Sequence, residues 1–510
     1  MNKNTLIVLG VIFLFALILR FLYFPGNVYF GFDQARDAFA ALEILKGNLR
    51  LIGPPTGVEG WYHGPLYYYI YAPVYFFFDG NPEGVAGLLR IINAGGIFLI
   101  FLIASVLFNK TVGLFSSLLF AISFEQTQYA LYFNHPSLAV VSVLIFYLGL
   151  ALFFFRKENK GLILASLGLG LSIQFEFVLL YLIFILVTLI IFLKHYIPKP
   201  KTGLYLFSFF GLLLTVSTFI ISELKFNMRS ATILLSIISN LNSNGLTFGN
   251  IVGNVFLISN RLIYDNFISF GSFPTFLLIV LLAFFLMYLR NNDIRPKLVF
   301  LFVWFLGGWI PYLGNKSLTP LYYYNVGASA SFLIFSSFLI QKIWAKTKLT
   351  GLGFLIIIFI SNIMLITKFN PGGPINTINV QSGMLLSDEK KAIDYIYREA
   401  KGVPFAINSL SMPLNVNTTW SYLFEWYGGK KYRYLPVWGG DAAMGYPGNL
   451  QIQVSRSNLP KMQFLIIEPS RGIRAPLIDK FMDNEAYFSD VVSEEQFGQL
   501  VVQSRRGRDT

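Results

Sequence analysis

The sequence predicts an α-helical polytopic membrane protein with about eleven transmembrane helices and a small C-terminal α/β domain. Two observations lead to this fold class. The chain of 510 residues is 55% hydrophobic and only 13% charged, with a mean hydropathy of +0.60, whereas a soluble domain carries about 25% charged residues. Apolar runs close to the roughly 20 residues that cross a bilayer as a helix recur along most of the chain.

The charge and cysteine content narrow the classes of function. A net charge of +13 would suggest a nucleic-acid partner in a soluble protein. Here the basic residues gather in short clusters between apolar runs, which is typical of membrane proteins, and no basic groove with interleaved aromatic residues is evident. We therefore expect no nucleic-acid partner. The chain has no cysteine, so neither disulfides nor thiolate chemistry can contribute.

The first apolar run, 5–24, could be misread as a signal peptide. It is longer than the apolar core of such a peptide and is not followed by a small-residue cleavage site, so we expect a retained span. Ten further runs are expected to span the membrane: 85–108, 111–128, 136–155, 161–175, 177–193, 204–222, 275–290, 297–313, 325–341 and 349–367.

Every second connection between these runs is basic, and the connections in between are weakly charged or acidic. Because basic loops stay on the cytoplasmic side, this alternation predicts a cytoplasmic N-terminus in the cell (plasma) membrane. An odd number of spans then puts the C-terminal tail outside. The basic segments are Asn109-Lys110, Arg156 to Lys160, Lys194 to Lys201, Arg290 to Lys297 and Lys342 to Lys348.

Two outer loops are too long to be turns. The transmembrane part, 1–367, contains them at 26–84 and 223–274. The first loop is expected to hold an amphipathic helix from Phe32 to Lys46. It also holds a Tyr- and Phe-rich stretch from Leu66 to Phe78 that suits the membrane interface.

The tail, 368–510, changes character and is expected to form a soluble extracytoplasmic domain. Ser387 and the acidic residues after it predict a helix that runs to about Ala400. Phe405-Ala406-Ile407 and Phe464 to Ile467 are typical of short buried strands. About 140 residues are enough for an α/β domain.

A charged group follows the first apolar run directly. In Gly31-Phe32-Asp33-Gln34-Ala35-Arg36-Asp37, the residues Asp33, Arg36 and Asp37 share one face of a helix. Ionised side chains at membrane depth are costly and tend to mark function. The alternative is a helix N-terminus with acidic residues that its dipole favours and a local ion pair. The spacing alone does not decide between the two.

Aromatic residues surround a histidine further along the same loop, in Trp61-Tyr62-His63-Gly64-Pro65-Leu66-Tyr67. His63 is one of three histidines, and a single interfacial histidine is more often structural than catalytic. The Tyr67 cluster and Tyr322 to Tyr324 are expected mainly to anchor helices at the interface. No zinc, nucleotide or dinucleotide motif is present.

These features resemble the GT-C membrane glycosyltransferases. The similarity is greatest to the group of protein O-mannosyltransferases and lipid A aminoarabinose transferases and covers roughly residues 1–200. That group opens its first outer loop with Asp-Glu-x-Arg-Tyr, where this chain has Asp33-Gln34-Ala35-Arg36-Asp37. Its Pro-Pro-Leu-Tyr segment looks like Gly64-Pro65-Leu66-Tyr67.

The resemblance implies transfer of a sugar from a polyprenyl-phosphate donor to a hydroxyl of a protein, lipid or glycan at the outer membrane face, with inversion. Asp33 would be the general base, and Arg36 beside it would help to keep it ionised. Asp37 and Glu176 would support catalysis. Candidates for binding the donor phosphate or the acceptor are His63, Tyr67, Arg229, Arg261 and Lys316.

Two departures from the pattern of this group affect the expected site. The Glu after the first Asp is Gln34, which weakens the case for a metal there. Phe133-Asn134-His135-Pro136 stands where many relatives have an acidic residue, so a second carboxylate must come from elsewhere or be unnecessary. Glu176 could supply it, or could be a helix-end residue facing water or headgroups. No cofactor and no metal ligand are predicted, although the resemblance leaves room for a divalent cation.

Two other kinds of function fit the hydropathy. A transporter or flippase for lipid-linked saccharides would usually show repeated halves and broken helices near the midplane, and neither is evident. A non-catalytic cell-envelope assembly protein could use the tail to bind a partner, but this leaves the loop with Asp33 and His63 without a role.

Overall fold

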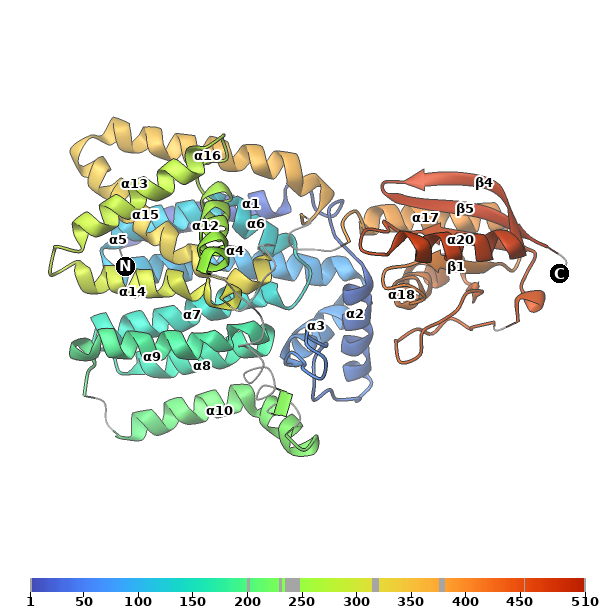
Figure 1. Cartoon of the computed structure of the whole chain (residues 1–510), viewed down its shortest axis with the longest axis horizontal. Coiled ribbons are helices and arrows are strands. Elements are labelled where there is room, and N and C mark those ends of the chain that lie inside the picture. Colours follow the sequence, from blue (N-terminus) through green and yellow to red (C-terminus); the bar gives the residue numbers. More distant parts are fainter. Residues whose placement is uncertain are drawn as a thin grey trace.

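The computed structural model describes residues 2–199, 202–228, 232–233, 248–313, 321–375, 381–453 and 455–508. A bundle of long helices carries the N-terminus, and a smaller domain with a sheet carries the C-terminus (Figure 1). Two helices of the first outer loop lie between these parts (Figure 1). The predicted fold class, a helical membrane protein with a small C-terminal α/β domain, is confirmed.

All eleven predicted apolar runs fall on helices. The helices of the bundle are α1 (Lys3–Phe21), α4 (Pro82–Leu107), α5 (Lys110–Ile122), α6 (Phe124–Leu131), α7 (Pro136–Phe155), α8 (Lys160–Phe175), α9 (Leu182–Phe192), α10 (Thr202–Lys225), α12 (Phe248–Tyr264), α13 (Phe273–Tyr288), α14 (Arg295–Gly307), α15 (Ala328–Lys346) and α16 (Lys348–Phe369). Short 3-10 turns join several of them, including η1 (Phe177–Tyr181), η2 (Lys194–Tyr196), η4 (Ile310–Tyr312), η5 (Tyr322–Asn325) and η6 (Asn370–Gly372).

Length and hydropathy identify a multi-pass membrane protein. In the described part of the chain, 6 helices are long and apolar enough to cross a membrane. These six are α1, α4, α7, α10, α15 and α16. Shorter apolar helices accompany them at Lys110–Ile122, Lys160–Phe175, Phe177–Phe192 and Phe273–Tyr288. The number of eleven spans remains a prediction.

The basic turns meet at one end of the bundle. The side chain of Lys157, after α7, donates a hydrogen bond to the carbonyl of Tyr196, and Lys297 lies 5.8 Å from the ring centroid of Phe108. Helix α7 has 20 residues and is therefore about 30 Å long. The first outer loop and the tail lie at the opposite end, at the start of α7. This arrangement matches the predicted alternation of loops; which end faces the cytoplasm remains a prediction.

A buried arginine ties the first helix to the bundle. Arg20 in α1 is 1% exposed. Its Nε donates to Asn93 Oδ1 of α4 at 2.7 Å, and Nη1 donates to the carbonyl of Ala121 in α5 at 2.9 Å. A guanidinium taken out of water is tolerated when its donors are satisfied in this way. These hydrogen bonds hold the first helix in the bundle.

Helices α7 and α8 pack unusually closely through glycines. A Cβ atom placed on Gly168 of α8 would lie 2.7 Å from Phe146 Cα of α7, with the Phe146 nitrogen closer still. A Cβ on Gly149 of α7 would lie 2.6 Å from the carbonyl oxygen of Gly161 in α8. Glycine lets the two backbones touch, which fixes the start of α7 beside the end of α8.

The first outer loop contains the two expected helices. Helix α2 (Phe32–Leu45) matches the predicted amphipathic segment, and α3 (Leu66–Phe77) matches the Tyr-rich stretch. The second long loop is described in part and contains α12. Near its beginning, the tail pairs with the first outer loop through the backbone. Phe30 N–H donates to the carbonyl of Met384, and Leu386 N–H donates to the carbonyl of Val28.

The tail forms a mixed sheet with helices packed against it. Its strand order is β2-β1-β3-β5-β4, in which β1 pairs in parallel with β2 and β3, and β5 is antiparallel to β3 and β4. The predicted helix and both predicted strands are present. The elements are α17 (Leu386–Ala400), β1 (Ala406–Leu410), α18 (Thr418–Leu423), η7 (Phe424–Gly429), α19 (Lys430–Tyr432), β2 (Val437–Trp438), η8 (Arg456–Asn458), β3 (Met462–Ile467), α20 (Ala475–Phe488), β4 (Ser489–Phe497) and β5 (Leu500–Gly507).

Candidate active site

A cavity of about 770 Å³ lies where the bundle, the first outer loop and the tail meet. This volume is in the range of small-molecule sites. The tail contributes Gln381, Met412 and Pro413 to the wall. The other lining residues belong to five stretches of chain, within 29–36, 54–63, 132–136, 176–180 and 323–324.

Helix α2 begins at the edge of this cavity and is held there by Gln34. The Gln34 side chain accepts a hydrogen bond from Gly31 N–H at 3.1 Å and donates one to the carbonyl of Phe133 at 2.6 Å. Gln34 is 2% exposed and does not line the cavity. The amide that replaces the Glu of the related pattern therefore caps α2 and connects it to the segment before α7.

Arg36 joins the two carboxylates of the predicted face. Its Nη1 lies 2.6 Å from Asp33 Oδ1, and its Nη2 lies 2.8 Å from Asp37 Oδ1. The Asp33 side chain is 48% exposed and lines the cavity, whereas the Asp37 side chain is 3% exposed beneath it. The expectation that the three residues share one side of a helix is confirmed. Their chemical roles stay predictions.

Burial sets the charge state of Asp37. Loss of hydration raises the pKa of this carboxyl to about 6, although Arg36 works in the opposite direction. Tyr68 of α3 donates a hydrogen bond from its hydroxyl to Asp37 Oδ1 at 3.3 Å. Asp37 thus binds the guanidinium from its buried side, and Asp33 binds it from the side of the cavity.

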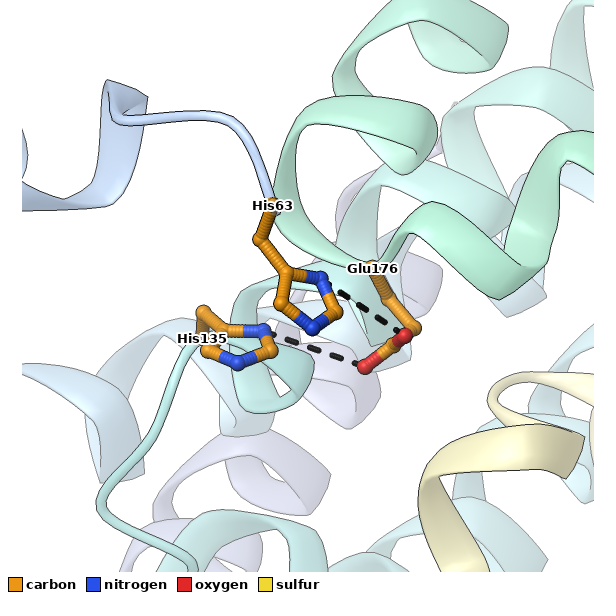
Figure 2. A group of neighbouring side chains, drawn as sticks. All are labelled: His63, His135 and Glu176. Carbon is orange, nitrogen blue, oxygen red and sulfur yellow. Dashed lines mark ion pairs between the residues drawn. The ribbon is translucent and has the colours of Figure 1, made fainter. Parts of the chain in front are cut away.

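His63, His135 and Glu176 form a second polar group (Figure 2), and all three line the same cavity. The Nδ1 atoms of His63 and His135 each lie 3.8 Å from a different oxygen of Glu176. The two imidazole ring centroids are 4.1 Å apart. Residues from three distant segments, the first loop, the start of α7 and the end of α8, therefore meet at one point.

Burial favours the uncharged form of each of these three side chains, which lie outside the spanning helices. It lowers the pKa of His63 well below the usual value and that of His135 to about 3. It raises the pKa of the Glu176 carboxyl to about 8. Glu176 is 2% exposed and lines the cavity at the end of α8, which distinguishes it from a helix-end residue exposed to bulk water.

The other predicted site residues are placed as follows. Tyr67 of α3 is buried behind the cavity wall, with its ring centroid 5.3 Å from that of His135. Arg229 and Lys316 lie outside the described residues. Arg261 of α12 is not among the residues that line the cavity.

Arg261 belongs to a separate buried cluster. Its guanidinium lies 3.8 Å from Glu125 and 3.7 Å from Asp265, and it stacks over the ring of Tyr322 at 4.5 Å. The hydroxyl of Tyr322 donates to Asp265 Oδ2 at 2.6 Å. The structure therefore places Arg261 in a network that joins α6, α12 and the 322–325 turn.

The sequence interpretation missed part of the cavity wall. In the sequence, His135 was noted only as part of the segment that lacks an expected carboxylate. In the structure its ring lies beside Glu176. Tyr323 and Tyr324 line the cavity, although an anchoring role was expected for them. A histidine directly before a proline-initiated helix was the available signal, because such a residue lies at the bundle end where the outer loops gather.

Comparisons with known proteins identify the fold. Residues 62–222 match the model of the dolichyl-phosphate-mannose-protein mannosyltransferase family. The chain has the GT-C glycosyltransferase fold, and the resemblance found in the sequence is confirmed. None of the curated protein sequences compared with the chain matches it.

Particular solved structures share this fold over most or all of the chain. ArnT from Cupriavidus metallidurans bound to undecaprenyl phosphate aligns over 99% of this chain and 98% of its own, with a TM-score of 0.62 and 11% identity. Its apo form aligns over 97% and 98%, with a TM-score of 0.59 and 12% identity. The apo oligosaccharyltransferase of Archaeoglobus fulgidus aligns over 78% of this chain and 58% of its own, with a TM-score of 0.52 and 14% identity.

Proposed function

We propose that this protein transfers a sugar from a polyprenyl-phosphate carrier to an acceptor hydroxyl at the outer face of the membrane. The observation that carries the proposal is the half-exposed Asp33 carboxylate on the wall of a 770 Å³ cavity, ion-paired to Arg36. A structural neighbour, ArnT, has been crystallised with undecaprenyl phosphate. The matched family model concerns transfer from dolichyl-phosphate-mannose to protein.

Asp33 would act as the general base. It removes the proton of the acceptor hydroxyl while that oxygen attacks the anomeric carbon of the sugar. The bond from the anomeric carbon to the phosphate oxygen breaks, and the lipid phosphate leaves with the electron pair. A single direct displacement inverts the anomeric centre. A positioned base of this kind typically contributes about 10²–10⁴ in rate.

Arg36 would be a positioning residue for this base. The guanidinium holds Asp33 from one side and is itself held by the buried Asp37 at 2.8 Å. A bridged arrangement restricts rotation of the Asp33 side chain, so less freedom is lost when the acceptor binds. The acceptor would reach the base through the space shared with the tail, whose residues line the same cavity.

Transfer can be tested with the purified full-length chain in proteoliposomes. Radiolabelled polyprenyl-phosphate mannose and polyprenyl-phosphate aminoarabinose serve as donors, with detergent-extracted membranes as the source of acceptors. We expect label to leave the lipid fraction, and Asp33→Asn to lower the rate by about 10²–10⁴. The matched control is Glu43→Gln, a partly exposed carboxylate on the same helix that pairs with Lys46.

Glu43→Gln should retain the rate of the parent protein. Near-normal transfer by folded Asp33→Asn would remove Asp33 from the role of base. Movement of labelled lipid across the vesicle membrane with no new glycosidic bond would instead support a flippase.

A further inference from the structure

His63, His135 and Glu176 are arranged like the protein ligands of a metal ion. Each offers one nitrogen or oxygen, and these atoms all lie within 4.8 Å of one another. All three side chains are buried and point toward a common centre (Figure 2). No sequence motif predicts this group, because its members are far apart in the chain.

The hydrogen bond of His135 leaves one ring nitrogen available. Its Nδ1 lies 2.5 Å from the carbonyl oxygen of Phe175 and must donate to it, so Nε2 is the unprotonated nitrogen of the neutral ring. Histidines that bind metals usually donate their other ring N–H to a carbonyl or carboxylate in this way. The carbonyl of Phe175 therefore fixes the tautomer of His135 that metal binding requires.

The hydrogen bonds that His63 and Glu176 make to other described groups are long. Nδ1 of His63 accepts a long hydrogen bond of 3.3 Å from Phe177 N–H. Within the described residues, Glu176 accepts a long hydrogen bond of 3.4 Å from Val178 N–H. A buried carboxylate normally has stronger partners, since burying a charge without them is costly. A cation at the centre of the group would supply one.

We propose that these three side chains bind a divalent cation of the zinc class. Two histidines and one glutamate leave a fourth position for water or substrate, which is the ligand set of many catalytic zinc sites. Bond lengths near 2.1 Å in a tetrahedron put neighbouring ligand atoms about 3.4 Å apart. The candidate ligand atoms of the three side chains lie within 4.8 Å of one another, so side-chain rotations of about 1 Å bring them to this spacing.

The location of the site indicates what the cation would do in the reaction, and this part of the inference rests on the proposed function. His63, His135 and Glu176 line the same cavity as Asp33. A cation there would bind an anionic oxygen such as that of a lipid phosphate and would stabilise the charge that develops as it leaves. This places a positive charge on the wall where the sequence interpretation had expected His63 itself to supply one.

Zinc binding can be measured on the full-length protein in detergent, without donor or acceptor. The protein is purified without a histidine tag, stripped with a chelator and titrated with ZnCl₂, and bound metal is counted by elemental analysis. Absorption of the Co²⁺-substituted protein reports a tetrahedral ligand set with nitrogen donors. We expect one zinc per chain, and at least about 100-fold weaker binding in His63→Gln, His135→Gln and Glu176→Gln.

The third histidine provides the matched control. His195 lies in the turn η2 (Lys194–Tyr196) among the basic connections, so His195→Gln should bind zinc like the parent protein. Size-exclusion profiles and thermal unfolding identify variants that have not folded. If a histidine variant does not fold, Glu176→Gln still tests the site, because it preserves the side-chain shape. Asp33→Asn should keep its zinc, which separates this proposal from the proposed transfer reaction.

Three results would overturn the metal site. One is the absence of bound zinc in the folded parent protein. Another is unchanged zinc affinity in the folded Glu176→Gln and histidine-site variants. The third is a zinc signal that is lost in His195→Gln.

Discussion

The close packing of α7 and α8 predicts the effect of a single added methyl group at Gly168. In Gly168→Ala the new Cβ would lie 2.7 Å from Phe146 Cα and closer to the Phe146 nitrogen. Ordinary contacts begin at 3.4 Å, so the two backbones must separate by about 1 Å. The atoms in the way belong to the main chain and cannot rotate aside. The helices themselves must move.

The size of the effect follows from two opposing contributions. Overpacking of this kind costs about 1–3 kcal/mol, whereas replacing a helical glycine by alanine contributes up to about 1 kcal/mol through helix propensity. Gly95→Ala in α4 is the matched control, because a Cβ there meets nothing within 4 Å. Both variants share the propensity gain, so the difference between them isolates the overpacking cost of about 1–3 kcal/mol.

Thermal unfolding of the purified proteins in one detergent measures this difference. Gly168→Ala should unfold several degrees below Gly95→Ala. Its transfer rate should also fall by up to about 10²-fold, because α7 follows His135 and α8 precedes Glu176, and a shift of about 1 Å at a reacting site has that effect. If the two alanine variants unfold at the same temperature, the glycine contacts do not hold the helices together as described.

Two further predictions concern the face of α2. Burial raises the pKa of Asp37 from 3.8 to about 6, so the folded protein keeps this proton in a pH range where the unfolded chain has lost it. The contribution of this carboxyl to stability should therefore fall by about 2 kcal/mol between pH 4 and pH 7. Asp37→Asn should lack this component, and parallel pH profiles of the unfolding temperature for the two proteins would contradict it. Arg36→Lys should lower transfer about ten-fold or more, because one ammonium cannot bridge Asp33 and Asp37 as the planar guanidinium does. Unchanged transfer in that variant would mean that a positive charge near Asp33 is sufficient.

Local features of the site could be predicted from the sequence. Asp33, Arg36 and Asp37 are three and four residues apart, and helix geometry alone puts them on one side of α2. The apolar runs likewise predict helices, because their length and composition are local properties. The tail helix from Leu386 to Ala400 follows from the acidic residues of its first turn, Asp388 and Glu389, whereas Ser387 lies inside the helix and does not cap it.

Contacts between distant segments could not be predicted in the same way. His63, His135 and Glu176 meet only because α3, α7 and α8 pack in one particular arrangement, and no short pattern encodes that arrangement. Arg261 shows the converse limit: its position on an outer loop suggested the donor site, and only tertiary packing reveals that it lies beside Glu125 and not among the residues that line the cavity. Membrane topology predicts the side on which a loop lies but not which loops touch.

The tail is fastened to the rim of the membrane part at several points. Tyr422 donates a hydrogen bond to the carbonyl of Gly80 at 2.6 Å, and Lys390 pairs with Glu83 at 2.5 Å. The same domain places Met412 and Pro413 over the cavity. Changes in these covering loops would alter which molecules fit above Asp33 while leaving the carboxylate and its arginine untouched. Under the proposed function, acceptor selection would therefore depend on residues of the sheet-containing domain, while the proposed base stays fixed on α2.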